Sequence, residues 1–194
     1  MKRFKLFLGI ITFFFISYCN LLCLHASDSK MSDAGFTSFM ESIEIEIPEC
    51  QTYDVPENSG FKSYMTYTLF TKQSNQYQLQ TLCTTDSEGF RKIDDYYCIA
   101  LGTFFDVEIG QRIDLELKNG QTIKCVLGDV KADCHTDSSN IFTTQNNCMS
   151  EFIVDTKYLN ETVKQQGNVS YLPTEDWNSP VALVRIYDEN ILNS

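Results

Sequence analysis

The stretch Ile113-Asp114-Leu115-Glu116-Leu117, then Lys118-Asn119-Gly120-Gln121, then Ile123-Lys124-Cys125-Val126-Leu127, decides the fold. On each side of Asn119-Gly120, apolar residues alternate with polar ones, which is typical of a half-buried strand. Asn-Gly supplies the positive φ angles that a type I′ turn requires. The sequence therefore predicts a β-hairpin with one apolar face on the core.

Further strands are predicted on either side of this hairpin. Phe152–Val154 and Pro180–Ile186 are apolar runs of strand length. Two shorter alternations lie upstream, at Tyr67, Leu69 and Thr71 and at Tyr77, Leu79 and Thr81. A long polar stretch, Lys131–Asn147, predicts a structureless loop that is either functional or disordered.

One short surface helix is predicted at residues 157–166, with Asp155 or Thr156 as its N-cap and Gly167 at its end. Short strands, a hairpin and a single helix indicate a mainly β fold. We expect a small barrel rather than an α/β sheet.

The N-terminus has the features of an export signal. Three basic residues precede the apolar run Leu6–Ile16, and a small residue, Ala26, follows. We expect residues 1–26 to be a signal peptide, residues 27–60 an N-terminal arm or linker, and residues 61–190 the β-barrel domain. An uncleaved membrane anchor is the alternative, because the weakly broken run to Leu24 is nearly long enough to span a bilayer. Either way, the protein is expected to be secreted or held at the cell envelope.

The charge limits the partners. The 194 residues hold 15 Lys and Arg against 26 Asp and Glu, a net charge of −11. Removing residues 1–26 takes away three basic groups and no acid, so the mature balance is 12 − 26 = −14. Such a surface excludes broad binding to nucleic acid or to anionic lipid. Cationic partners and neutral polymers such as glycans stay open. We expect a monomer that binds peptidoglycan or another glycan, without a cofactor or a specific membrane partner, although repulsion would weaken its binding to an anionic cell wall.

The cysteines predict disulfides. Of eight cysteines, six remain after residue 26, and an even number in an exported chain favours pairing. Cys134 is expected to pair with Cys148 across the polar loop, and the other four allow three pairings. Of these, Cys98 with Cys125 is preferred because both flank core strands.

The chemistry is concentrated between Asp129 and Glu151. Asp129, Asp133, His135 and Asp137 fall within nine residues just after a predicted core strand, and Glu151 begins the next one. Carboxyls near apolar strand ends can acquire a raised pKa through burial and mutual repulsion, and a carboxyl of raised pKa can protonate a leaving oxygen. Two other hypotheses stay open: aspartates that only form turns, or a cation site made by Asp133, His135 and Asp137.

Four segments resemble the three-aspartate (3D) domain family. They are Tyr97–Gly102, Ile109–Leu115, Val126–Asp129 and Glu151–Val154. The chain is also similar to uncharacterised secreted proteins of Gram-positive bacteria and their phages, through Tyr97–Gly102, Lys131–Asp137 and Glu151–Asp155. The 3D family adopts a double-psi β-barrel and includes lytic transglycosylases that cleave peptidoglycan, so the resemblance implies a small six-stranded double-psi β-barrel.

The resemblance also implies roles for single residues. Asp129 matches the first family aspartate and Glu151 the second, which makes them the candidate catalytic acid/base, with Asp133, His135 and Asp137 as candidate substrate-binding residues. The chain departs from the family in reading Asp129-Val130-Lys131-Ala132 in place of Asp-Thr-Gly-Gly. A lytic transglycosylase-like activity and a non-catalytic envelope-binding or structural module are therefore both retained, with a metal-binding interaction domain as the third hypothesis.

Overall fold

The computed structural model describes residues 49–56 and 59–193. The expected signal peptide, residues 1–26, lies outside the described residues, as does most of the expected arm or linker. The elements in chain order are β1 (Cys50–Asp54), β2 (Lys62–Thr66), α3 (Asn75–Leu82), β3 (Thr84–Thr85), β4 (Arg91–Ile93), β5 (Tyr96–Gly102), β6 (Gln111–Leu117), β7 (Thr122–Lys131), β8 (Ser150–Val154), α4 (Glu161–Gln166) and β9 (Val181–Asn190). Neither described helix is long and apolar enough to cross a membrane.

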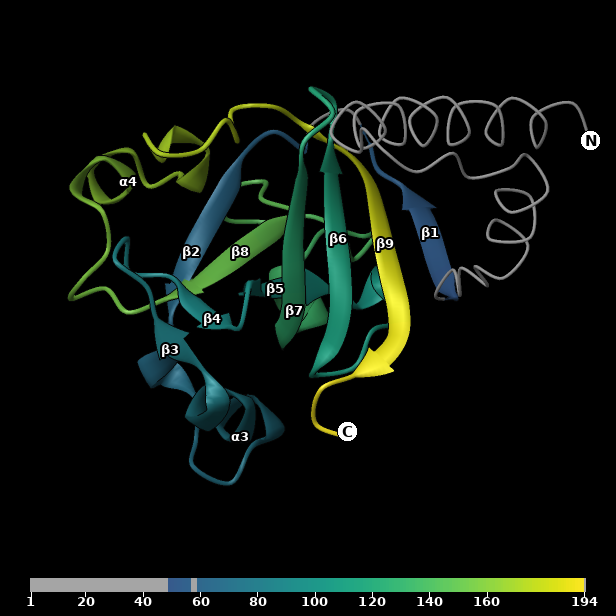
Figure 1. The fold of residues 1–194 in the computed structure, drawn as a ribbon. Helices are drawn as coiled ribbons and strands as arrows, with labels where there is room; N and C mark the ends of the chain where they lie inside the picture. The colour runs from purple at the N-terminus through teal and green to yellow at the C-terminus, as the bar shows by residue number, and fades with distance from the viewer. Residues whose placement is uncertain (1–48, 57–58, 194) are drawn as a thin grey trace, which may run out of the picture. The chain divides into compact units, whose positions relative to one another are not determined.

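The nine strands form one open mixed sheet (Figure 1). Its main path runs β1-β9-β6-β7-β5-β4-β3. Strand β5 is the branch point of the sheet. One edge of β5 pairs with β7, and the other edge pairs with two strands, β4 near the start of β5 and β8 nearer its end. Strand β8 also pairs with β2. The three branches end at β1, β3 and β2, which do not pair with one another. The predicted six-stranded double-psi barrel is therefore wrong: the sheet does not close.

The predicted hairpin is confirmed, but its turn type is wrong. β6 and β7 are antiparallel, with Ile113 opposite Cys125 and Leu115 opposite Ile123. Only Gly120 has a positive φ in the loop, at 89°. The Leu117 carbonyl accepts from the Gly120 N–H, and the Leu117 N–H donates to the Gln121 carbonyl. This pattern is a three-residue loop with glycine in the left-handed position, so Asn119 does not need a positive φ.

Two further predicted strands are confirmed, and two other elements differ. Phe152–Val154 lies in β8 and Val181–Ile186 in β9. Helix α4 ends at Gly167 as expected, but begins only at Glu161, where the Asn160 side chain accepts from two backbone N–H groups. The alternation around Leu79 belongs to helix α3, not to a strand, because the Ser74 hydroxyl accepts from the Tyr77 N–H and caps a helix there.

Strand β1 lies within the segment expected to be an arm or linker. Cys50–Asp54 pairs with β9 in antiparallel register, with Tyr53 opposite Val184. The Tyr53 ring meets Phe105 edge to face, with centroids 5.5 Å apart. This part of the chain therefore extends the sheet by one edge strand and packs against the core.

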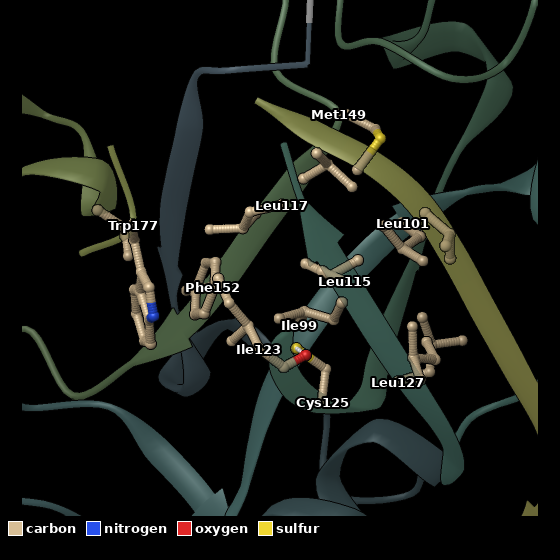
Figure 2. Close-up of a cluster of buried hydrophobic side chains, with 14 of the residues drawn as sticks. Ile99, Leu101, Leu115, Leu117, Ile123, Cys125, Leu127, Met149, Phe152 and Trp177 are labelled. Carbon is tan, nitrogen blue, oxygen red and sulfur yellow. Dashed lines mark hydrogen bonds between the residues drawn. The ribbon is translucent and has the colours of Figure 1, made fainter. Parts of the chain in front are cut away.

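The sheet has two apolar faces. The larger cluster fills one face and contains side chains from β5, β6, β7, β8 and β9 (Figure 2). Trp177 belongs to it: the indole is 3% exposed and stacks on Phe152 at 5.4 Å. The indole therefore has no exposed face on which a sugar could stack. The smaller cluster, Leu79, Cys98, Val126 and Ile153, lies on the opposite face under helix α3.

The polar stretch 131–147 is ordered rather than structureless. Asp137 accepts hydrogen bonds from the Ile141 and Phe142 N–H groups, and Phe142 is buried. A second anchor is the Asn140 carbonyl, which accepts from Phe104 N–H and lies directly over Gly102 at the end of β5. The loop is thus fixed to β5 by close backbone packing.

The close packing at Gly102 predicts a large cost for one methyl group. In Gly102→Ala the new Cβ would overlap the Asn140 carbonyl oxygen, a backbone atom that cannot swing away. We expect a loss of about 2 kcal/mol in unfolding free energy, measured by urea denaturation. Gly60→Ala is the matched control, because its Cβ would meet only Pro180 at an ordinary 3.8 Å. Equal stabilities of the two variants would contradict this account of the loop.

Candidate functional site

A β-bulge at Gly128 decides which way the end of β7 faces. Strands β5 and β7 run parallel with Ile99 beside Leu127, and then Ala100 lies beside Asp129 rather than Gly128. In a strand without the bulge, Asp129 would follow Leu127 onto the larger apolar face, because side chains alternate. The extra residue instead turns Asp129 and Lys131 to the face of helix α3 and leaves Val130 against the larger cluster.

The same face receives a second carboxylate from β8. Ala100 pairs with Asp129 on one side and with Glu151 on the other, so the three residues form one row across β7, β5 and β8. Two strand spacings put the Asp129 and Glu151 backbones roughly 10 Å apart. Both line an open hollow of about 490 Å³, a size suited to a small ligand or part of a polymer.

Asp129 is a half-buried carboxyl with few polar contacts. Its Oδ1 accepts a hydrogen bond from the Gln76 side-chain amide at 3.0 Å. Burial raises the pKa of Asp129 above its ordinary value, and the bonds from Gln76 and the Val130 backbone, together with the charge of Lys131, offset this only in part. A raised pKa keeps more of the carboxyl protonated at a given pH, which favours a role as a general acid.

Lys131 places a cation beside Glu151, and its charge also acts on Asp129. Its Nζ lies 3.8 Å from Glu151 Oε2 and donates to the Met149 carbonyl at 3.2 Å. The Lys131 side chain is 4% exposed, and this burial lowers its pKa. The neighbouring Glu151 carboxylate is 21% exposed and supplies the compensating charge. The two carboxyls therefore differ in their side-chain partners, since Glu151 has a cation 3.8 Å away whereas Asp129 accepts from the Gln76 amide.

The outer wall of the hollow comes from the loop after β7. His135 is exposed and lines the hollow together with Thr143, Thr144 and Gln145. The wall is held by backbone bonds, since the Thr144 N–H donates to the His135 carbonyl and the Thr143 N–H to the Cys148 carbonyl. Met65 and Leu69, from β2 and the turn after it, add apolar side chains to the lining.

Two of the predicted site residues do not line the hollow. The Asp133 carboxylate accepts from the Thr103 hydroxyl at 2.5 Å, and Asp137 accepts from Ser139 and from the backbone of its own turn. The hydrogen bond from Ser139 is the main reason that the pKa of Asp137 is lowered. Of the five residues proposed from sequence, Asp129, His135 and Glu151 thus share the hollow, whereas Asp133 and Asp137 serve the loop.

The structure joins neither of the predicted cysteine pairs. All six described cysteines are free thiols. Cys98 and Cys125 lie in different apolar clusters on opposite faces of the sheet, and Cys134 is exposed whereas Cys148 is buried. No three His, Cys, Asp or Glu side chains come together as metal ligands within residues 49–56 and 59–193, so Asp133, His135 and Asp137 do not converge there.

Sequence reasoning missed two polar residues of this site. Gln76 lies on a helix that the sequence does not predict. Lys131 falls in the polar stretch and in the Lys131–Asp137 resemblance segment, and neither assigns a role to its side chain. The sequence does contain a signal for the bulge. The apolar residues Ile123, Cys125 and Leu127 recur every second position, but the next one on that face, Val130, comes three positions after Leu127. That change of spacing, with a glycine inside it, is typical of a strand bulge.

The arrangement can supply acid catalysis. It combines a half-buried carboxyl of raised pKa, a second carboxylate balanced by a lysine, and an open polar hollow, and such pairs divide acid and base roles by environment.

No known protein family, curated protein or solved structure matches this chain. The functional argument therefore depends on the geometry and charge of the hollow.

The raised pKa of Asp129 predicts a pH-dependent gain in stability for Asp129→Asn. Wild-type protein loses stability as pH rises through the folded-state pKa, because the buried carboxyl must then ionise. Asparagine cannot ionise and can still accept from Gln76. As pH rises from about 3 to about 7, the unfolding free energy of Asp129→Asn should therefore increase relative to that of the wild-type protein.

Urea denaturation at each pH measures this difference. Asp188→Asn, at an exposed position on β9, corrects for the loss of one negative charge from an acidic protein. If, after this correction, the wild-type protein gained stability relative to Asp129→Asn as pH rises, the result would contradict a raised pKa at Asp129.

Proposed function

We propose that this chain is an exported cell-envelope protein that cleaves glycosidic bonds in a glycan such as peptidoglycan, with Asp129 as the general acid. The observation that carries the proposal is the row Asp129–Ala100–Glu151, which places two carboxyls of unlike environment in one open hollow. The signal-like N-terminus supports export. The acidic charge of the protein disfavours contact with the anionic groups that cell walls often carry, so the proposal places the contact on the sugar chain itself.

The proposed chemistry begins with proton transfer. Protonated Asp129 donates its proton to the glycosidic oxygen as the bond from that oxygen to the anomeric carbon breaks. A hydroxyl then adds to the anomeric carbon, and the Asp129 carboxylate takes up the proton that this hydroxyl loses. The residue ends the cycle in the state in which it began, so one carboxyl serves as acid and then as base.

Glu151 and Lys131 have supporting roles in this scheme. The Glu151 carboxylate faces the hollow and stabilises the positive charge that develops on the sugar ring. Lys131 Nζ, 3.8 Å away, keeps Glu151 and the adjacent backbone carbonyls in place. His135, exposed on the outer wall, donates or accepts hydrogen bonds to sugar hydroxyls.

Incubation of the purified protein with cell-wall sacculi tests the proposal. We expect soluble muropeptides to be released, and mass spectrometry of their ends identifies the attacking hydroxyl. An anhydro end shows attack by the muramic 6-hydroxyl, and a reducing end shows attack by water. Asp129→Asn should slow release by about 100-fold or more, and Glu151→Gln by roughly 100-fold.

The matched control is Asp188→Asn, which removes the same charge from an exposed position on β9. It should release muropeptides at the wild-type rate. Sacculus binding without release by the wild-type protein would instead favour the alternative, a non-catalytic envelope-binding module. Full release by Asp129→Asn would overturn the assignment of the acid.

A further inference from the structure

The two thiols closest to each other lie beneath helix α3, away from both predicted disulfides. Cys83 Sγ and Cys98 Sγ are 3.2 Å apart. Cys83 ends helix α3 as its C-cap, and Cys98 lies in β5 at the centre of the sheet. A disulfide has its sulfurs about 2.05 Å apart, so these two need to approach by only about 1.2 Å.

We propose that Cys83 and Cys98 form a disulfide in the exported protein, and that this bond fixes helix α3 to the centre of the sheet. The inference is independent of any catalytic activity. It depends on the sulfur contact, on the position of both residues in one apolar cluster with Leu79, and on the oxidising compartment that a signal peptide implies.

The surroundings divide the two sulfurs into an attacking and a resolving thiol. Cys83 is partly exposed and lies beside the buried Arg91 guanidinium, which donates to the Cys83 carbonyl. The hydrogen bond with Cys98 and the Arg91 charge lower the pKa of Cys83. Cys98 is fully buried, and both the bond to Cys83 and burial raise its pKa. An external disulfide therefore reaches Cys83 first.

The oxidation can be written as two exchanges with a low-molecular-weight disulfide such as oxidised glutathione. The Cys83 thiolate attacks one sulfur of the oxidant, forms a mixed disulfide and releases one glutathione thiol. Cys98 then attacks Cys83 Sγ and releases the second glutathione. The two electrons of the protein thiols reduce the oxidant, and their two protons end on its two thiols.

The bond would act on the hollow through helix α3. The C-terminal end of this helix is already held by Arg91, whose guanidinium donates to the Gln80 carbonyl at 2.7 Å and to the Cys83 carbonyl at 2.9 Å. Its first turn carries Gln76, which donates to Asp129. A covalent link at Cys83 would therefore restrict the helix that positions the hydrogen-bond donor of Asp129.

Peptide mapping identifies the bond directly. The full chain, exported into an oxidising compartment or oxidised with glutathione, is alkylated without reduction and digested with trypsin. Cleavage at Lys72, Arg91, Lys92 and Arg112 yields peptides 73–91 and 93–112, which contain Cys83 and Cys98 as their single cysteines. We expect these two peptides to be found linked. Alkylated Cys83 and Cys98, or Cys98 linked to the peptide that contains Cys125, would overturn the proposal.

Thermal melting gives a second readout that does not depend on a substitution in the core. Reductant should lower the Tm of oxidised wild-type protein by roughly 10 °C, because the bond closes a loop from residue 83 to residue 98. Cys83→Ser should melt at one temperature with and without reductant. Cys50→Ser, an exposed cysteine on β1, is the matched control and should keep the full response. A wild-type Tm that reductant leaves unchanged would also overturn the proposal.

Discussion

The β-bulge at Gly128 is the constraint on which the arrangement of the hollow depends. Up to Leu127, strand β7 follows the alternation that buries Cys125 and Leu127 in the larger cluster. The shift of register between Ile99 and Ala100 then places Asp129 in the row with Ala100 and Glu151. Without that shift the Asp129 carboxylate would face the apolar core, where a charge without a partner is strongly unfavourable.

Three buried cations hold the irregular segments against this sheet. Lys62, at the start of β2, donates to the Trp177 carbonyl at 3.0 Å and to the Ser179 carbonyl at 2.8 Å, and burial lowers its pKa to about 8. Arg91 donates to carbonyls at the end of helix α3, and Lys131 to carbonyls before β8. Each side chain thereby adds a charged donor to carbonyl oxygens outside the strand pairing, some of which also accept from a backbone N–H group.

The sequence predicted the parts of the fold that depend on local pattern. The β6–β7 hairpin and the strands β8 and β9 follow from alternation, from Gly120 and from apolar runs. Barrel closure was wrong because it depends on which distant edges meet, and β5 pairs with β4, β7 and β8 in a way that no local pattern encodes. Helix α3 was missed because five alternating residues fit a strand as well as a helix until the Ser74 cap is seen to bond Tyr77.

The candidate site was predictable in part, for related reasons. Asp129 and Glu151 lie at the end of one strand and the start of the next, which sequence order identifies, but strict alternation would turn Asp129 to the apolar face and only the bulge at Gly128 corrects this. Asp133 and Asp137 lie in the loop, where a carboxylate can bond Thr103 or the backbone of its own turn as readily as it can face a ligand. Gln76 comes to Asp129 from 53 positions away in the chain, a contact that only the tertiary fold defines.

The packing of the loop after β7 has a thermodynamic consequence for any ligand of the hollow. Thr143, which lines it, is buried, and Asn146 donates to Ser63 in β2. The outer wall is therefore assembled before a ligand arrives, and binding need not bear the conformational entropy cost of ordering that segment. Binding should therefore restrict mainly the ligand itself and a few exposed side chains, such as His135 and Gln145, and the loss of conformational entropy should come from these.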